Sequence, residues 1–556
     1  MVLVGGEVHN GDGTEPVVAD VAIRGDRIVA IGDLADHPAT LTLDVSGLVV
    51  APGFIDIHSH AIRDNPDRSG IYLWPDAENL IRQGVTTVIG GPDGGSPLPL
   101  EADFQRLEKD PAAVNYGSFV GQGSVREKVV GYEDRPATEE ELEAMRAEVR
   151  AAMESGAFGL SSGLLYAPGS FAPAEEVIEL AKVVKPFGGI YISHMRNEAL
   201  GLLDSVEETI RIGEAAGVPS QLTHHKAMGQ PMWGRSSESL ALVDAANERG
   251  VDVTIDQYPY PASSTGLRAV FPRWSLDGGG PALRARLDDP KLRARVKEGI
   301  LYALINERGG NDPSRVHLAQ CGFDPALNGL NLEDVLLQRE MDVTIENAAE
   351  LIMDFEYAGG CQCVYHAMSM QDVDRIMVHP KTMIASDGGV MAPGDNSPHP
   401  RNYGTFPHKV RSYVLEEGVM SLEDAVRSMT SLPAQVYRMS DRGRLVLEAR
   451  GKVGYRQGNL SADWRFARSF TLGLSGSLAD YADGNEKPWN VDTLREIAIV
   501  LSVDENGLTP ADDGFEVALT QTKATAFKCS GNDDKALHKA YIKVKGDGLT
   551  IKGNCD

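Results

Sequence analysis

Several short apolar segments of the sequence end in histidine or aspartate, side chains that commonly bind divalent metal ions. His58 and His60 end one segment, and because they lie two residues apart on a predicted strand they project to the same face. The other segments end at Asp93, His194, His224 and Asp387. Imidazole and carboxylate groups gathered around one point are ligands for an ion such as Zn²⁺. These residues can form a metal site only if the fold brings the segment ends together.

Eight apolar segments alternate with helical patterns from residue 51 onward. They cover residues 54–60, 86–93, 118–123, 158–163, 190–194, 221–226, 251–258 and 382–387. Between them, Thr138 and Glu141 form a capping box that predicts a helix through about Glu154. Apolar strands that alternate with helices are typical of a parallel sheet, and eight of them favour a closed α/β fold, the (β/α)8 TIM barrel. The carboxyl ends of the strands meet at one mouth of such a barrel, so we expect the metal site there.

The rest of the chain is predicted to form additions to this barrel. Residues 1–50 indicate a small β domain, and residues 51–440 the barrel. The interval before the last strand is too long, which predicts an inserted helical lid subdomain at about 270–345. Residues 441–468 are a possible return to the small β domain, expected to be a β-sandwich. Cys361 and Cys363 lie two residues apart, so on a strand they would point the same way, and they are interpreted as small core residues.

The C-terminal segment differs in composition from everything before it. Residues 469–556 contain eight Lys but a single Arg, Arg495. Three strand-like runs stand out within it, at 496–503, 515–519 and 540–544. The segment is therefore treated as an atypical, Lys-rich addition of unknown purpose.

Composition excludes several classes of function. The chain has 556 residues and a formal net charge of −27, which argues against binding to nucleic acid or to an anionic membrane surface, because both require clustered Lys and Arg. No stretch reaches the roughly 18 apolar residues of a membrane span. The N-terminus lacks the features of a signal peptide, so a cytoplasmic location is expected. The oligomeric state is left open.

Longer stretches of the sequence resemble the N-acyl-D-amino-acid deacylase (D-aminoacylase) family of the amidohydrolase superfamily. The resemblance covers roughly residues 1–440 and includes the opening motif Pro52–His60. The most specific stretches are Ser193–Glu198, which reads Ser-His-Met-Arg-Asn-Glu, and His399–Phe406, which begins His-Pro-Arg. Further support comes from residues 84–88, 161–169, 223–226, 256–260 and 386–388.

The resemblance implies a role for each candidate metal ligand. His58 and His60 would bind one metal position, and His194 and His224 a tightly held zinc. The family usually has a Cys ligand at the end of strand 2, where this sequence has Asp93 in a Gly-Pro-Asp-Gly stretch, so Asp93 is the candidate replacement. Strand 4 ends in Ser-Ser-Gly and offers no bridging Lys. One or two divalent ions, Zn²⁺ in the first place, are therefore expected.

The resemblance also implies a mechanism and a substrate. Asp387 would be the general base that takes a proton from a metal-activated water and the acid that passes it to the leaving amine. Lys226, Arg401 and Tyr258 (or the nearby Tyr260) would bind the substrate α-carboxylate, and Tyr166 would line the same pocket. The expected activity is hydrolysis of N-acyl-D-amino acids to a carboxylate and a free D-amino acid.

Other functions and the substrate side chain remain open at this point. The alternatives are an amidohydrolase acting on D-residue dipeptides or on a cyclic amide of the dihydroorotase or hydantoinase type, and a non-catalytic barrel. An acidic D-amino acid would require one more cation in the pocket. Arg196, Arg268 or a residue of the insertion are the candidates for that cation.

Overall fold

A computed structural model describes most of the chain. It covers residues 1–34, 36–62, 70–392, 394 and 396–446, together with the backbone of four later strands between residues 499 and 554. Among these residues, we find no helix with the length and apolar character needed to cross a membrane.

Parallel strands form the predicted barrel. In chain order they are β6 (Phe54–Asp56), β7 (Val85–Gly90), β8 (Asn115–Ser118) continued by β9 (Val120–Gly121), β10 (Gly159–Gly163), β11 (Ile190–His194), β12 (Ser220–Leu222), β13 (Val253–Gln257) and β17 (Thr382–Ile384). Neighbouring strands pair in parallel from β6 to β8 and from β9 to β17. A parallel bridge between Ser59 and Gly388 joins the first strand to the last. The eight predicted segments are thus confirmed as barrel strands, with boundaries shifted by a few residues.

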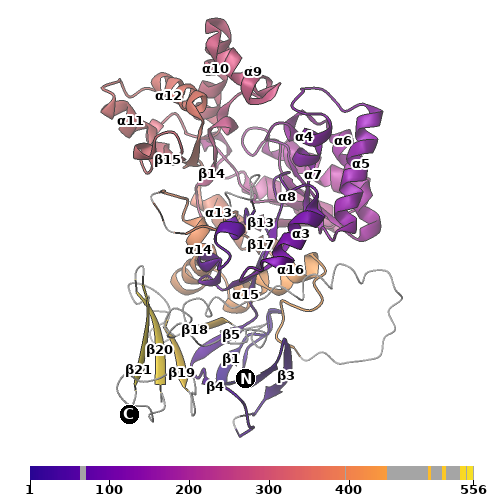
Figure 1. Cartoon of the computed structure of the whole chain (residues 1–556), viewed down its shortest axis with the longest axis vertical. Helices are drawn as coiled ribbons and strands as arrows, with labels where there is room; N and C mark the ends of the chain where they lie inside the picture. The colour runs from indigo at the N-terminus through magenta and orange to yellow at the C-terminus, as the bar shows by residue number, and fades with distance from the viewer. Residues whose placement is uncertain are drawn as a thin grey trace.

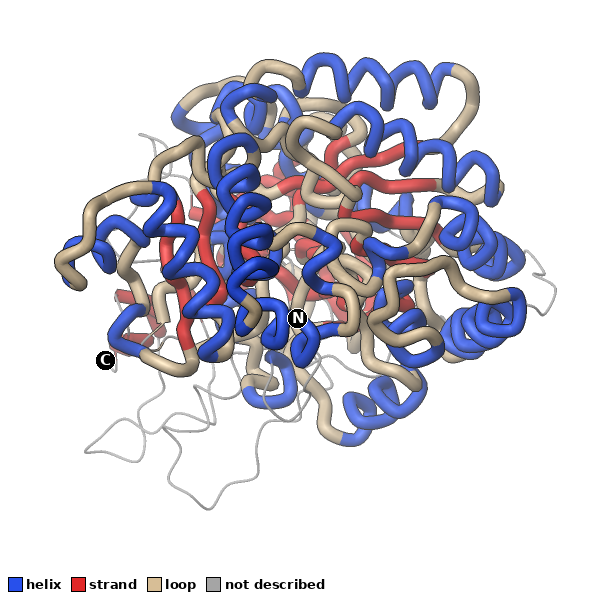
Figure 2. The backbone as a smooth tube through the Cα atoms, turned by 90° about the horizontal axis from the view of Figure 1, so that it is seen from above, coloured by secondary structure: helices blue, strands red, loops and turns tan. Residues whose placement is uncertain are grey.

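Helices surround the strands, as the tube in Figure 2 shows. The sequence explains their ends well: Thr138 caps α5 (Glu139–Glu154) in the predicted capping box, and Ser421 caps α15 (Leu422–Met429). The others are α1 (Gly70–Leu73), α2 (Glu78–Ile81), α3 (Leu100–Lys109), α4 (Gln122–Val129), α6 (Ala174–Val184), α7 (Leu202–Ala216), α8 (Ser236–Glu248), α13 (Met370–Met377), α14 (Arg401–His408), a π-helical turn (Lys409–Glu416) and α16 (Ser431–Val436).

The inserted segment between β13 and β17 is longer than predicted and is not purely helical. Its helices are α9 (Gly279–Asp288), α10 (Pro290–Asn306), α11 (Leu332–Gln338) and α12 (Ile345–Ala358). They pack on an antiparallel sheet of β14 (Ser263–Gly266), β16 (Cys361–Tyr365) and β15 (Val316–Cys321), with a hydrophobic core of their own. Figure 1 shows these helices at the opposite end of the molecule from the N-terminus.

A disulfide links two strands of the inserted sheet. Cys361 on β16 is bonded to Cys321 on β15. Cys361 and Cys363 both lie on β16 in the hydrophobic core of the insertion, as interpreted from the sequence; the disulfide of Cys361 was not anticipated, and Cys363 remains a buried thiol. Antiparallel pairing of β15 with β16 places the two bonded cysteines opposite each other, a contact across 40 residues of sequence.

The N-terminal strands form a separate sheet. It contains β1 (Val2–Val8), β2 (Val17–Arg24), β3 (Arg27–Gly32), β4 (Thr42–Asp44) and β5 (Leu48–Ala51). The C-terminal segment adds β18 (Ile499–Ser502), which pairs antiparallel with β5. Next to this sheet lie β19 (Glu516–Thr520), β20 (Lys539–Lys545) and β21 (Gly548–Asn554), which pair antiparallel with one another (Figure 1). Residues 447–468, predicted as a possible return to this domain, lie outside the described residues.

Candidate metal centre and active site

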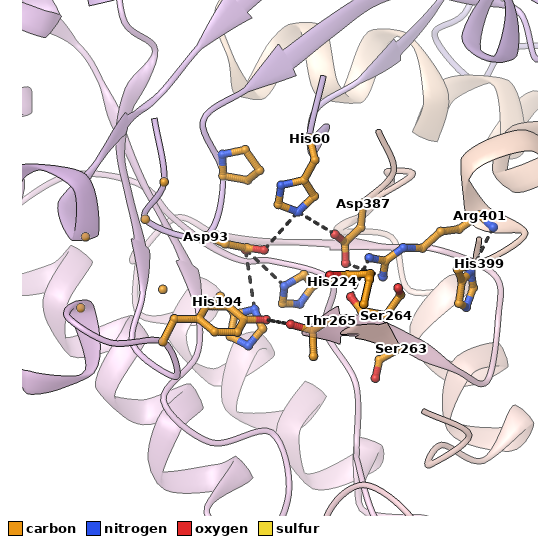
Figure 3. Close-up of a pocket in the computed structure, with 18 of the residues that line it drawn as sticks. His60, Asp93, His194, His224, Ser263, Ser264, Thr265, Asp387, His399 and Arg401 are labelled. Atoms are coloured by element: carbon orange, nitrogen blue, oxygen red, sulfur yellow. Dashed lines mark hydrogen bonds and ion pairs between the residues drawn. The ribbon is translucent and has the colours of Figure 1, made fainter. Parts of the chain in front are cut away.

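The barrel brings the six predicted metal and acid–base residues into one cluster. His58 and His60 follow β6, Asp93 follows β7, and Asp387 follows β17, while His194 ends β11 and His224 follows β12. One set of ligand atoms comes from His58, His60, Asp93 and Asp387, and a second from Asp93, His194 and His224. Within each set, the atoms lie within 4.8 Å of one another. Figure 3 shows Asp93 between His60 on one side and His194 and His224 on the other.

Three of these residues adopt a backbone conformation that side chains rarely take. Asp93, His224 and Asp387 have φ angles of 54°, 35° and 50°, in the left-handed region, which costs roughly 1–3 kcal/mol each for strained non-glycine residues. The His224 amide donates to Asp256 Oδ1 at 2.7 Å, and the Asp387 amide donates to the carbonyl of His58 at 2.9 Å. The surrounding loops therefore hold the strained conformation that aims these side chains at the cluster.

The spacing of the side-chain atoms fits a shared metal ion better than direct hydrogen bonds. Asp93 Oδ1 lies 3.4 Å from His58 Nε2 and 3.3 Å from His224 Nε2, and Asp93 Oδ2 lies 3.4 Å from His60 Nε2. Two ligands bound tetrahedrally to one Zn²⁺ are about 3.3–3.6 Å apart. Among the described residues, Asp93 Oδ1, His58 Nε2 and His194 Nδ1, which face one another in the cluster, are buried without a hydrogen-bond partner. Buried polar atoms of this kind, all of them metal ligands by chemistry, fit a divalent cation.

Two carboxylates behind the histidines were not anticipated from the sequence. Glu198 Oε1 lies 3.1 Å from His224 Nδ1, and Glu198 Oε2 lies 3.6 Å from His194 Nε2. Asp256 Oδ2 lies 3.6 Å from His58 Nδ1. Carboxylates that accept the second ring N–H of a metal-binding histidine fix its orientation and raise its basicity. Glu198 and Asp256 lie in two of the stretches that resemble the family, Ser193–Glu198 and residues 256–260. No spacing rule, however, predicts that their carboxylates point at the histidine rings.

Lys226 lies in the pocket but is already paired. Its Nζ donates to Glu198 Oε1 at 2.5 Å and lies 2.7 Å from His224 Nδ1. Burial alone would raise the pKa of Glu198, but the charge of Lys226 lowers this pKa well below its usual value. Lys226 therefore neutralises the carboxylate behind two candidate metal ligands, in addition to facing the pocket.

Replacing Glu198 with glutamine tests this supporting role. Removal of the carboxylate leaves Lys226 without its buried counter-ion and weakens the hold on His224, so we expect metal affinity to fall by about 10–100-fold. Metal content after dialysis against graded chelator concentrations measures this, and excess metal should restore activity. Glu208→Gln is the matched control, because Glu208 pairs with Arg196 outside the cluster. Unchanged metal affinity in Glu198→Gln would contradict the assignment.

Asp387 is held as a carboxylate by a buried arginine. Arg401 Nη1 donates to Asp387 Oδ2 at 2.7 Å, while Asp387 Oδ1 lies 3.1 Å from His60 Nε2. Burial alone would raise the pKa of Asp387, but the charges of Arg401, His58 and His224 lower it below its ordinary value. One oxygen thus faces the metal ligands and the other faces Arg401, and the group is ionised at neutral pH.

The cluster opens into a cavity of about 360 Å³. Tyr166, Tyr258, Lys226 and Arg401 line it, as predicted, together with residues from all three strands of the inserted sheet. Tyr258 is buried, its hydroxyl has no hydrogen-bond partner among the described residues, and its ring centre lies 4.8 Å from Arg401 Cζ. Tyr166 hydrogen bonds to Thr265 at 3.1 Å.

Other candidates from the sequence lie away from the cluster. Tyr260 contacts the rings of His399 and His408. Arg196 pairs with Glu208, and Arg268 pairs with Glu356. Arg308, a residue of the insertion that no sequence motif identifies, follows α10 and lines the cavity.

Comparisons with known proteins match most of the chain. No family model matches. D-aminoacylase from Alcaligenes xylosoxydans xylosoxydans is 37% identical and aligns with 80% of this chain and 85% of its own length. N-acyl-D-glutamate deacylase from the same organism is 34% identical, with 81% and 85% covered. The crystal structure of N-acyl-D-glutamate deacylase from Bordetella bronchiseptica, complexed with zinc and a phosphonate mimic of the tetrahedral intermediate, is 33% identical over 80% of this chain and 87% of that one, with a TM-score of 0.66.

Proposed function

Because the chain belongs to the N-acyl-D-amino-acid deacylase family of the amidohydrolase superfamily, we propose how its own residues perform the family reaction. The protein is a metal-binding hydrolase that cleaves the amide bond of N-acyl-D-amino acids. The observation that supports the assignment of roles is the convergence of six imidazole and carboxylate groups on one cavity beside Arg401.

The metal is proposed to be Zn²⁺, bound by the two ligand sets that share Asp93. His194 and His224 would hold one position with Asp93, and His58 and His60 would hold the other. When bound, a zinc ion supplies an electrophile for the scissile carbonyl and lowers the pKa of water to about 7. Asp93 stands where the family usually has a cysteine, and its two oxygens face different histidines, so it can link both positions.

Asp387 is proposed as the general base and then the general acid. It takes a proton from the attacking water and afterwards gives this proton to the nitrogen of the departing D-amino acid. Its ionised state, maintained by Arg401, supports the first step. Its position beside His60 supports this role, because the carboxylate belongs to the cluster that would hold the metal.

The substrate α-carboxylate is proposed to bind around Tyr258. This part of the cavity is lined by the Tyr258 hydroxyl, which has no partner among the described residues, and by the Lys226 ammonium, 6.0 Å from the Tyr258 ring centre. Arg401 lines it too, with the N–H groups that it does not use for Asp387 Oδ2 and the Ser264 carbonyl. An arginine fork suits a planar carboxylate. Tyr166 forms an adjacent wall. The cytoplasmic location expected from the N-terminal sequence stays a prediction.

Substrate assays test the proposed function directly. Zinc-loaded protein is incubated with N-acetyl-D-amino acids, their L enantiomers, D-residue dipeptides and 5-substituted hydantoins, and release of free amino acid is measured. We expect hydrolysis of N-acetyl-D-amino acids, with little or none of the L forms. Failure to release an amino acid from every N-acyl-D substrate, or a preference for the cyclic amides, would contradict the proposal.

A further inference from the structure

Among the described residues, three lysine and arginine side chains line the cavity, and two of them are already paired with carboxylates. Lys226 pairs with Glu198, and Arg401 pairs with Asp387. The third is Arg308, for which the described part of the chain contains neither an ion-pair partner nor a hydrogen-bond acceptor. Its residue is only 4% exposed, and that exposure is toward the cavity it lines.

The surroundings of Arg308 hold its side chain in place without neutralising it. Its amide donates to the carbonyl of Ala303 in the last turn of α10. Its guanidinium carbon lies 5.6 Å from the ring centre of Tyr365 on β16, close enough for a cation–π contact. Burying a guanidinium with no anionic partner is costly, so a charge kept this way beside a cavity favours an anionic ligand.

Arg308 belongs to a different wall of the cavity from the residues around Tyr258. Arg401 and Lys226 flank Tyr258 and follow barrel strands, whereas Arg308 contacts Tyr365 and comes from the inserted segment. The proposed α-carboxylate position already has Tyr258 and two cations. Arg308 therefore provides a second, separate position for an anion in the same cavity, which suits a ligand that carries two anionic groups.

We propose that Arg308 binds a second carboxylate of the substrate, and that the enzyme therefore prefers N-acyl-D-amino acids that carry two carboxylates. This inference rests on the proposed function. The second carboxylate can belong to an acidic D-amino acid side chain or to a dicarboxylic acyl group. Either one would form the parallel pair of hydrogen bonds that arginine makes with a planar carboxylate.

Matched substrates separate these two sources. N-acetyl-D-glutamate and N-acetyl-D-aspartate are compared with N-acetyl-D-glutamine and N-acetyl-D-asparagine, which have nearly the same shape but no second charge. N-succinyl-D-methionine is compared with N-acetyl-D-methionine. In one pair or the other, we expect kcat/KM to be about 10–100-fold higher for the dicarboxylate, a ratio typical of one charged hydrogen-bonded contact.

Variants assign this preference to Arg308. Arg308→Met keeps the unbranched apolar part of the side chain without its charge, and should lower kcat/KM for the preferred dicarboxylate by about 10–100-fold, mainly through KM. Its effect on the matched amide or monocarboxylate should be far smaller, and Arg308→Lys should restore part of the preference. Arg295→Met is the control, because Arg295 is exposed on α10 and stacks on Trp274 outside the cavity lining.

Distinct outcomes would overturn the inference. Equal loss on charged and uncharged substrates would make Arg308 a structural residue or an α-carboxylate ligand. A wild-type enzyme that shows no preference in either pair, and no tighter product inhibition by D-glutamate than by D-glutamine, would refute it without any variant. After either outcome, hydrolysis of neutral N-acyl-D-amino acids would still support the proposed function. Inactivity on every N-acyl-D substrate would instead contradict the proposed function and this inference together.

Discussion

Replacement of Asp387 with asparagine is expected to lower kcat on N-acyl-D-amino acids by about 10³-fold, within the 10²–10⁴-fold range of general acid–base catalysis. Asparagine has the same size, and its amide oxygen can still accept the hydrogen bond that Arg401 Nη1 donates at 2.7 Å. It can neither take a proton from water nor give one to the leaving amine. The measurements are kcat and the zinc content of the purified variant, which should equal that of the wild-type enzyme.

The control for this variant is Asp374→Asn. Asp374 also accepts a hydrogen bond from a buried side chain, the hydroxyl of Tyr413 at 2.9 Å, but does not line the cavity. Its turnover should stay near wild type. Undiminished turnover in Asp387→Asn would remove Asp387 from the proton transfer. Loss of zinc together with turnover would instead show that Asp387 acts as a metal ligand.

The barrel and the residues of its mouth could be predicted because local patterns determine them. Parallel strands buried on both sides appear in the sequence as continuous apolar runs. A barrel brings the carboxyl ends of its strands together independently of the conformation of the connecting loops. His194 and His224 are thus brought together by β11 and β12, which pair with each other. The capping box at Thr138 is equally local, and the structure has it as predicted.

Contacts between distant segments could not be predicted in the same way. Glu198 and Lys226 form their ion pair across 28 residues, and Cys321 pairs with Cys361 across 40. No periodicity indicates which buried charge will meet which partner. The absence of a partner is equally hidden in the sequence. Arg308 is notable because it has no ion-pair partner among the described residues, and only the positions of the neighbouring side chains show this.

The same distinction explains the differences in the inserted segment. The length of the interval before the last strand predicts a helical insertion at about 270–345; α9, α10 and α11 lie within these bounds, whereas α12 extends beyond them. The short strands β14, β15 and β16 carry no such signal, since four to six residues are too few to separate a strand from a loop by pattern alone. Yet these strands supply a wall of the cavity, so part of the site is built from elements that the sequence pattern does not reveal.

Removal of the metal is expected to abolish turnover and to lower the melting temperature. Turnover should be lost because the proposed chemistry needs an electrophile that no described side chain in the cavity supplies. Stability should fall because, without the metal, buried imidazoles would face one another with no partner. A metal present at 1,000 times its Kd stabilises the folded state by about 4.1 kcal/mol, so its removal should lower Tm by several degrees. Activity and Tm are measured before chelation, after it, and after zinc is added back.

Asp93 gives this experiment its sharpest internal check, because both ligand sets contain it. Asp93→Ala removes the carboxylate whose oxygens face histidines on both sides, so we expect less zinc per chain, greatly reduced turnover and a Tm close to that of the chelated wild-type enzyme. Chelation should then change Tm of the variant much less than that of the wild type. Full activity in chelated wild-type protein, or a chelator effect on Tm that is just as large in Asp93→Ala, would show that the cluster around Asp93 is not the metal centre.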